Sequence, residues 1–401
     1  MSGKSAISTE NVAQRYGDVM MNTFGAPQLV LVRGEGSFVW DDTGKQYLDL
    51  LGGIAVNVLG HAHPKVNKAI AAQAGQLGHV SNFFATPPQV ALAEKLAKMA
   101  TPNDPGRPAK VFLANSGTEA NEAAFKLARM TGRKRIIAME GSFHGRTMGA
   151  LAATFNPPYR EPFEPLPGVV EFVPFGNVAR LNRLVDDTVA AVVLEPIQGE
   201  NGVIEAPAGY LAEARKITAK AGALLWLDEI QSGMGRTGTW LASEPSGVTA
   251  DIVTFAKGLG NGFPIGACVA TGPAADLFTP GTHGSTFGGN PLAAAAALAT
   301  LGVIEAEGLL AHAAEMGAYI SRRIEDLHMF EVARTRGRGL MLGIELRTPV
   351  AKALAQACLE AGVIVNAPRP DVVRILPALN ITTEELDGFI DLLPKLFKAI
   401  R

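Results

Sequence analysis

The sequence predicts an α/β protein in which a mostly parallel sheet forms a large domain and a smaller α+β domain follows it. Between about residues 110 and 270, short and continuously apolar runs alternate with helical stretches. This alternation is typical of a parallel sheet that helices cover on both faces. After Pro291 the chain changes to longer helices and fewer strands. Its 401 residues, 47% of them hydrophobic, are enough for more than one domain.

We expect three parts along the chain: an N-terminal arm with strands that pack with the small domain, the large domain and the small domain, at residues 1–60, 61–290 and 291–401. In the first part we expect a short helix and then a hairpin at residues 36–49, which alternates apolar and polar residues. The second part should begin with two helices that start with proline, at residues 64–77 and 87–99.

Six apolar runs predict the strands of the large sheet, at residues 110–115, 135–139, 190–195, 223–228, 252–256 and 266–270. Helices are expected between some of them, at 119–130 and 210–221. In the small domain an Ala-rich helix leads into a second helix at 307–327. Strands are then expected at 339–346, 363–366 and 373–376, and helices at 350–361 and 383–400.

Composition excludes several classes of function. The net charge of −2 leaves no basic excess for a nucleic acid. Cys268 and Cys358 have no paired or metal-binding spacing, and His61 and His63 have no third ligand nearby, so we expect no disulfide and no metal site. The first ten residues lack the apolar core of a signal peptide, and the Ala-rich run is too short to span a membrane. A cytoplasmic protein without a membrane partner is predicted.

Lys257 ends an apolar, β-branched run and precedes a glycine-rich turn. It is either an ordinary strand-end lysine whose amine reaches water, or a Schiff-base lysine. In the second case burial lowers the pKa of the amine, which can then attack a carbonyl. The stretch itself does not decide between these interpretations.

Polar turns also follow four other predicted strands, beginning at Asn115, Glu140, Glu195 and Asp228. Because ligands of open α/β sheets bind beyond the carboxyl ends of the strands, turns that converge on one edge predict a binding site there.

Two of these turns are suited to bind a phosphate and a protonated ring nitrogen. Ser116 and Glu119 have the spacing of a capping box, and the N-terminus of the following helix suits a phosphate; a plain helix cap is the alternative. Asp228 follows four large apolar residues, so its carboxylate needs a partner such as a protonated ring nitrogen. A helix N-cap or a structural salt bridge is the alternative for Asp228.

Three further side chains are candidates for ligand contacts. Phe143, in a glycine-rich turn, either stacks on a cofactor ring or packs in the core. Arg146 and Arg374 are candidate clamps for carboxylates, because a guanidinium binds a carboxylate through two hydrogen bonds. Both are also easily interpreted as surface arginines. The loop at residues 81–86 is either a buried connection or faces a substrate.

A lysine, a buried aspartate and a phosphate-ready helix start together indicate pyridoxal 5'-phosphate. Motifs through nearly the whole chain carry a closer resemblance, among them Asn115-Ser-Gly-Thr-Glu119, Phe143-His-Gly-Arg146, Glu195-Pro-Ile-Gln-Gly-Glu200, Asp228-Glu-Ile-Gln231 and Lys257-Gly-Leu-Gly-Asn-Gly262. With them the sequence resembles the class III aminotransferases of fold type I, and most closely the acetylornithine aminotransferases of bacterial arginine biosynthesis. The resemblance implies a seven-stranded sheet and a homodimer with shared active sites.

The resemblance also implies a role for each matching residue. Lys257 forms the Schiff base with the cofactor and moves protons, and Asp228 pairs with the ring nitrogen. The other implied cofactor contacts are Gln231 at the ring hydroxyl, Phe143 on the ring, Ser116, Gly117 and Thr118 at the phosphate, and Thr286 at the phosphate of the neighbouring subunit. The implied substrate contacts are Arg146 and Ser285 for acetylornithine, Arg374 for 2-oxoglutarate, and Glu200, which pairs with Arg374 when that arginine is not needed.

The implied reaction moves the side-chain amine of N2-acetyl-L-ornithine to 2-oxoglutarate. Ornithine, succinylornithine and 4-aminobutyrate aminotransferases share almost all of these motifs, and an aminomutase on the same scaffold is a further alternative. A protein that binds a phosphate ligand without chemistry is the alternative from another class.

Overall fold

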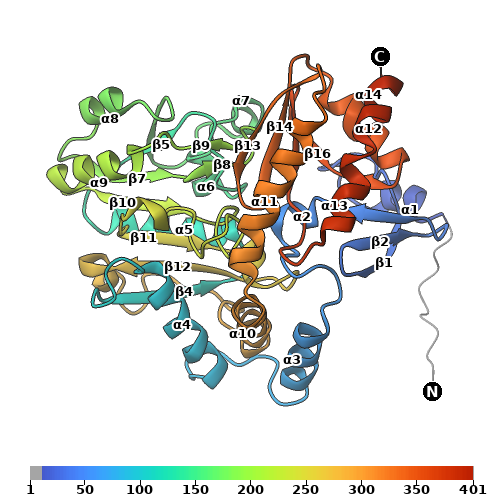
Figure 1. Cartoon of the computed structure of the whole chain (residues 1–401). Coiled ribbons are helices and arrows are strands. Elements are labelled where there is room, and N and C mark those ends of the chain that lie inside the picture. Colours follow the sequence, from blue (N-terminus) through green and yellow to red (C-terminus); the bar gives the residue numbers. More distant parts are fainter. Residues whose placement is uncertain (1–10, 401) are drawn as a thin grey trace.

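The computed structural model of the protein describes residues 11–400 (Figure 1). The expectation about a signal peptide, at residues 1–10, lies outside the described residues. Among these, no single helix is long and apolar enough to cross a membrane. By length and composition alone the bent pair of helices α10 (Pro291–Ala306) and α11 (Leu309–Asp326) passes that test.

Seven strands form the large sheet, as predicted. Their order is β4 (Ala109–Ala114), β12 (Gly266–Thr271), β11 (Ile252–Phe255), β10 (Leu224–Asp228), β7 (Val189–Leu194), β5 (Arg135–Met139) and β6 (Val169–Val173). β12 runs antiparallel to both of its neighbours, and all other pairs are parallel. The carboxyl ends of β4, β5, β7, β10 and β11 therefore lie at one edge. The sequence pattern misses β6, because Glu171 interrupts its apolar run in a half-exposed edge strand.

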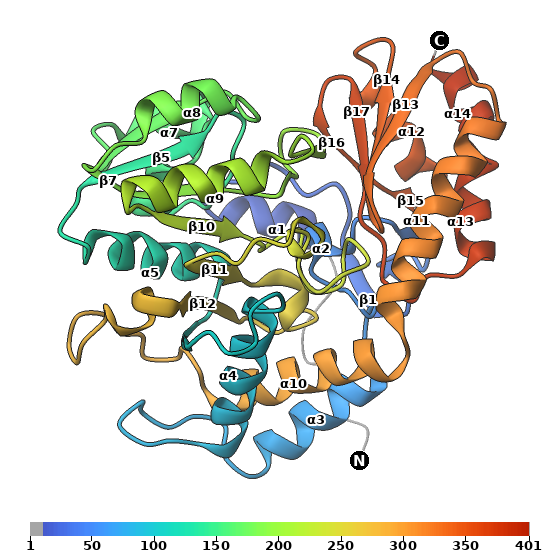
Figure 2. The same ribbon diagram turned by 60° about the vertical axis from the view of Figure 1, so that its left-hand side comes forward.

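Helices cover both faces of this sheet, because successive side chains of a strand point to opposite faces. On one face Trp226 and Ile252 pack with α5 (Gly117–Arg129) and α6 (Met148–Ala152). On the other face Leu225 and Leu227 pack with α4 (Pro87–Ala100), α8 (Val178–Leu184), α9 (Tyr210–Ala221) and α10. Figure 2 shows α5 and α9 on either side of β10.

A second sheet lies in the C-terminal part, in the order β13 (Val332–Arg338), β14 (Met341–Leu346), β17 (Val372–Ile375) and β16 (Asn366–Arg369). Helices α11, α12 (Ala351–Glu360), α13 (Thr383–Ile390) and α14 (Leu393–Ala399) pack around it. The prediction of one last helix at 383–400 is wrong. The helix ends after Ile390, and Pro394 lies in the first turn of α14, where its missing N–H is tolerated.

The N-terminal strands join the C-terminal part. β1 (Leu31–Glu35), β2 (Phe38–Asp41) and β3 (Gln46–Asp49) form a sheet with β15 (Val363–Ile364), and β2 and β3 form the predicted hairpin. β15 pairs parallel with β3, and Leu48 and Leu50 enter the C-terminal apolar core. We propose that the three parts of the chain divide at residues 60 and 290. Helix α10 packs into both apolar cores and so links the large and small domains.

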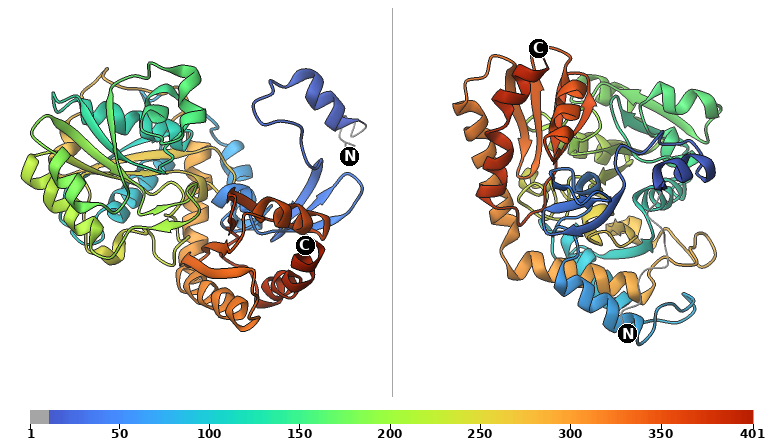
Figure 3. Two further views of the ribbon diagram at one scale, coloured as in Figure 1. Left: turned by 90° about the horizontal axis from the view of Figure 1, so that it is seen from above. Right: turned by 90° about the vertical axis from the view of Figure 1, so that its right-hand side faces the viewer.

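The remaining elements are short or peripheral: α2 (Gly52–Ala55), α3 (Pro64–Ala74), α7 (Pro157–Arg160), β8 (Ile197–Gln198) and β9 (Ile204–Glu205). Helix α1 (Val12–Val19) buries none of its side chains. Figure 3 shows α1 at the end of an arm that stands away from the rest of the chain.

Candidate active site

A cavity of about 380 Å³ lies at the edge of the large sheet where the carboxyl ends meet. It is lined by turns that follow β4, β5, β10 and β11. Most of the predicted cofactor residues are part of this lining, together with Arg146: Ser116, Gly117, Thr118, Phe143, Asp228, Gln231 and Lys257. The structure thus brings together residues that the sequence separates by more than one hundred positions.

Lys257 lies two residues after the end of β11 and lines this cavity. Its backbone has φ +44°, a left-handed conformation that residues other than glycine rarely adopt. The turn also packs closely, since a Cβ on Gly258 would lie 2.6 Å from Val58 Cγ1. Burial lowers the pKa of the Lys257 amine against the opposing charges of Glu200 and Asp228. Burial thus shifts the equilibrium of this amine towards its neutral, nucleophilic form.

Asp228 ends β10 and is 3% exposed. Its Oδ2 accepts hydrogen bonds from Asn121 Nδ2 (2.8 Å) and His144 Nδ1 (2.7 Å), and its Oδ1 accepts one from Ile230 N (3.0 Å). The helix-cap interpretation is wrong, because a turn follows β10. The three donors hold the carboxylate in one orientation beside the cavity. Asn121 and His144 were not among the predicted site residues; the one sequence signal is the histidine in the turn after β5.

Two further titratable groups lie around Asp228. Burial lowers the pKa of His144, but its hydrogen bond to Asp228 and the charge of that carboxylate outweigh burial, so the net pKa is raised. Burial raises the pKa of Glu195 to about 7. Glu195 accepts hydrogen bonds from Phe143 N (3.0 Å) and Gly199 N (3.4 Å). The floor of the cavity is therefore an acid–base cluster that burial keeps away from water.

Helix α5 begins at this cavity, with Ser116, Gly117 and Thr118 in the lining. Ser116 Oγ accepts a hydrogen bond from Glu119 N (3.2 Å), but Glu119 accepts from Asn115 N rather than Ser116 N, so the predicted capping box is half formed. A Cβ on Gly117 would lie 2.9 Å from Ile230 Cγ2, so the close approach suits glycine. The first N–H groups of a helix have no acceptor within it and attract anions. Amine, carboxylate and helix start fit the three functional ends of pyridoxal 5'-phosphate.

Arg374 lies behind this cavity, fully buried, so its interpretation as a surface arginine is wrong. Its Nη1 donates to Glu200 Oε1 (2.6 Å) and Gln231 Oε1 (2.9 Å), and its Nε donates to Asn366 Oδ1 (3.2 Å). Burial raises the pKa of Glu200, but the charge and hydrogen bond of Arg374 outweigh burial and lower it. Glu200 is therefore held as a carboxylate, in an ion pair with Arg374. Asn366 was not among the predicted site residues.

Arg146 lies at the outer rim of the cavity and is exposed. Its guanidinium carbon lies 3.3 Å from the ring centroid of Tyr159 and 5.8 Å from that of Phe143. Within residues 11–400 no carboxylate pairs with it. Its N–H groups are thus available to an anionic ligand.

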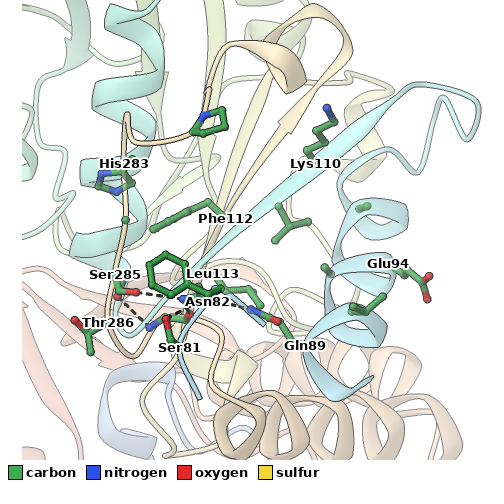
Figure 4. Close-up of a pocket in the computed structure, with 18 of the residues that line it drawn as sticks. Ser81, Asn82, Gln89, Glu94, Lys110, Phe112, Leu113, His283, Ser285 and Thr286 are labelled. Carbon is green, nitrogen blue, oxygen red and sulfur yellow. Dashed lines mark hydrogen bonds between the residues drawn. The ribbon is translucent and has the colours of Figure 1, made fainter. Parts of the chain in front are cut away.

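Ser285 and Thr286 do not line the cavity of Lys257. They line a second cavity of about 1270 Å³ beside β4, together with part of the 81–86 loop (Figure 4). Asn82 Nδ2 donates to the carbonyls of Ser285 (3.2 Å) and Gly288 (2.9 Å), and Phe83 is 92% exposed. The loop is therefore not a buried connection, and it does not reach Lys257 of its own chain.

Comparison with known proteins decides the family. The family model for class III aminotransferases matches residues 20–397. The chain belongs to this family. An acetylornithine aminotransferase from Mycolicibacterium smegmatis is 55% identical over 380 residues, which cover 95% of this chain and 96% of that protein. The predictions of a class III aminotransferase and of fold type I are confirmed.

Solved structures of the class III family superpose closely. The N-acetylornithine aminotransferase from Stenotrophomonas maltophilia is 37% identical with a TM-score of 0.81, covering 94% of this chain and 98% of that one. An ornithine aminotransferase from Toxoplasma gondii, whose active site has PLP at partial occupancy, is 32% identical with a TM-score of 0.91. It covers 99% of this chain and 96% of that one.

Proposed function

We propose that this class III aminotransferase transfers the side-chain amine of N2-acetyl-L-ornithine to 2-oxoglutarate, giving N-acetyl-L-glutamate 5-semialdehyde and glutamate. The 55% identity to an acetylornithine aminotransferase over 95% of the chain carries the choice of donor. The unpaired Arg146 supports it, because the reacting amine is at the far end of the donor from its carboxylate. The substrates are small molecules, and the proposed setting is arginine biosynthesis in the cytoplasm.

The residues around the cavity suit pyridoxal 5'-phosphate. The N-terminus of α5, with Ser116, Gly117 and Thr118, would bind the phosphate, and Asp228 would pair with the protonated ring nitrogen. Phe143 would stack on the ring, and Gln231 would reach its hydroxyl. When bound, the cofactor supplies the carbonyl that receives the donor's amine and a ring that withdraws electrons from the reacting carbon.

Lys257 then supplies the proton transfers. Its lowered pKa lets Nζ take a proton from the donor's reacting carbon and return it as general base and acid. Asp228, oriented by three hydrogen-bond donors, would place its carboxylate at the protonated ring nitrogen.

The Glu200–Arg374 pair fits the need to bind two unlike substrates. With Glu200 in place, Arg374 is neutralised and the inner end of the site accepts the uncharged chain of the donor. When 2-oxoglutarate enters, its second carboxylate would take the place of Glu200 on the guanidinium. Arg374 Nη2 is buried and has no acceptor among the described residues, which supports this because it offers a further donor.

We also propose a homodimer. Thr286 lines a different cavity from its own Lys257, which supports a role at the neighbouring subunit's phosphate. Exposed Phe83 and Phe287 and the unburied helix α1 supply apolar surface for a second copy. Analytical ultracentrifugation is expected to give a two-chain particle; a monomer at micromolar concentration would contradict the proposal.

The amino-donor profile tests the proposed reaction. Initial rates with 2-oxoglutarate should be highest for N-acetylornithine among N-acetylornithine, N-succinylornithine, ornithine and 4-aminobutyrate. A higher kcat/KM for any of the other donors would refute the donor assignment. Turnover without 2-oxoglutarate would instead indicate an aminomutase.

A further inference from the structure

Tyr159 lies against Arg146 at the outer rim of the candidate site, and neither the sequence motifs nor the proposed reaction includes it. It belongs to the short helix α7, between α6 and β6. Arg146 Cζ lies 3.3 Å from the centroid of the Tyr159 ring. A guanidinium over the face of an aromatic ring is attracted by the ring's electrons.

This contact orients Arg146 without occupying its hydrogen-bond donors. All N–H groups of a guanidinium lie in its plane and point outward from its edges. Stacking on a ring leaves those edges free, whereas a carboxylate partner would occupy two of them. Within residues 11–400 Arg146 makes no ion pair, so the aromatic contacts with Tyr159 and Phe143 are what hold its head group.

The position of Tyr159 is set independently of Arg146. The next residue, Arg160, lies over the ring of Phe172 at 4.8 Å. Its Nη1 donates to the carbonyls of Ala152 (3.3 Å) and Thr154 (3.4 Å), and its Nη2 pairs with Glu164 (3.3 Å). These contacts tie α7 to the body of the protein, so the Tyr159 ring is a fixed surface for the arginine.

The stacked pair lies where two cavities meet. Arg146 lines the cavity of Lys257, and Tyr159 lines a neighbouring cavity of about 710 Å³ together with Asn156 and Asn201. Phe143 lines both. A donor whose amine is at Lys257 and whose other end points outward would place that end beside Arg146.

We propose that Tyr159 is a specificity-determining residue of the donor half-reaction. Its ring positions the guanidinium of Arg146 for the α-carboxylate of the donor. This inference rests on the proposed function, which makes Arg146 the ligand of that carboxylate. A tyrosine that only stabilised the fold would instead affect donors with and without the carboxylate alike.

Two donors that differ only in the carboxylate separate these possibilities. The cofactor-loaded enzyme is mixed with N-acetylornithine or with N-acetylputrescine, which is the same molecule without its carboxylate, and the half-reaction is followed by cofactor absorbance. Tyr159→Leu is expected to raise the half-saturating concentration of N-acetylornithine about tenfold, equivalent to about 1.4 kcal/mol. The value for N-acetylputrescine should stay within about twofold. Tyr159→Phe, which keeps the ring, should resemble the wild type with both donors.

Further measurements use the same variants. In an Arg146→Gln background, Tyr159→Leu should have no further effect on N-acetylornithine, because the group that it positions is gone. Calorimetry with N-acetylnorvaline, which keeps the carboxylate but has no amine to transfer, should show the same weakening without turnover.

The outcomes distinguish two failures. If Tyr159→Leu raises the half-saturating concentrations of both donors equally, or of neither, the proposed role of Tyr159 is wrong. The proposed function is not affected by that result. A Tyr159→Phe enzyme as weak as Tyr159→Leu overturns the ring contact. A wild-type enzyme that does not react with N-acetylornithine overturns the proposed function, and this role with it.

Discussion

Arg374 and Arg146 lie at the inner and outer ends of the candidate site and are held in opposite ways. Arg374 is fully buried and bonded to Glu200, Gln231 and Asn366. Arg146 is exposed, and among residues 11–400 its guanidinium contacts the aromatic rings of Tyr159 and Phe143. Arg374 would bind 2-oxoglutarate but not the donor. A carboxylate partner that can be displaced, such as Glu200, suits an arginine with that role. An exposed arginine can stay unpaired between substrates, since water satisfies its N–H groups meanwhile.

The contrast also concerns energy. A buried guanidinium without a partner has a high desolvation cost, so the inner arginine requires Glu200 whenever no ligand carboxylate is present. The exposed arginine has no such requirement, and a contact that fixes its direction is enough. Substitutions at the inner end should therefore cost more than those at the rim.

The largest effect is expected between the two arginines, at Lys257. Lys257→Ala should lower the half-reaction rate with N-acetylornithine roughly 10⁴-fold or more, because it removes both the nucleophile and the proton-transfer group. Lys134→Ala, at an exposed lysine, serves as the control. Stopped-flow absorbance measures both, and appreciable turnover by Lys257→Ala would refute the proposed chemistry.

At the inner end, Arg374→Gln should weaken the half-reaction with 2-oxoglutarate about 30- to 1,000-fold, because the acceptor's second carboxylate loses a buried cation. The donor half-reaction should change much less, since Glu200 neutralises Arg374 in that step. Equal losses in the two half-reactions would contradict the proposed exchange of Glu200 for the acceptor.

At the rim, Arg146→Gln should raise the half-saturating concentration of N-acetylornithine about 10- to 100-fold. This effect is smaller than that at the inner end, because an exposed charge pair contributes less than a buried one. The half-saturating concentration of 2-oxoglutarate should rise less, because Arg374 still binds one of its two carboxylates. If 2-oxoglutarate weakened as much as the donor, the division of labour between the two arginines would be wrong.

The smallest effect concerns stability and pH. Burial raises the pKa of Glu195 to about 7, above its ordinary value. The folded protein thus binds more protons than the unfolded chain between about pH 4.5 and 7, and stability falls as pH rises through that window. Glu195→Gln should reduce this fall in the free energy of unfolding by up to roughly 3 kcal/mol. Urea unfolding of the cofactor-free protein between pH 5 and 8 measures it, with exposed Glu161→Gln as the control; parallel profiles of Glu195→Gln and wild type would contradict the raised pKa.

Local patterns in the sequence predicted much of the fold. Helix α9 and strand β5 have the predicted bounds, because a helical or continuously apolar run is a property of neighbouring residues. The errors are local as well. Strands β6 and β13 were not predicted, because charged residues interrupt their apolar pattern. Helices α13 and α14 were predicted as one helix across Pro394.

The site divides in the same way. The sequence alone placed Lys257 and Asp228 at strand ends and a phosphate-ready helix start after Asn115, which indicated the cofactor, and the resemblance of their motifs indicated the family. The resemblance also implied the pairing of Glu200 with Arg374, and the structure shows that contact across 174 positions. Only the tertiary structure decided that His144 meets Asp228, 84 positions away. It also placed Arg146 on Tyr159 and Thr286 in a separate cavity. The reason is physical. A residue's place at the end of a strand follows from its neighbours in the chain, whereas its partner, its burial and hence its pKa depend on how distant elements pack.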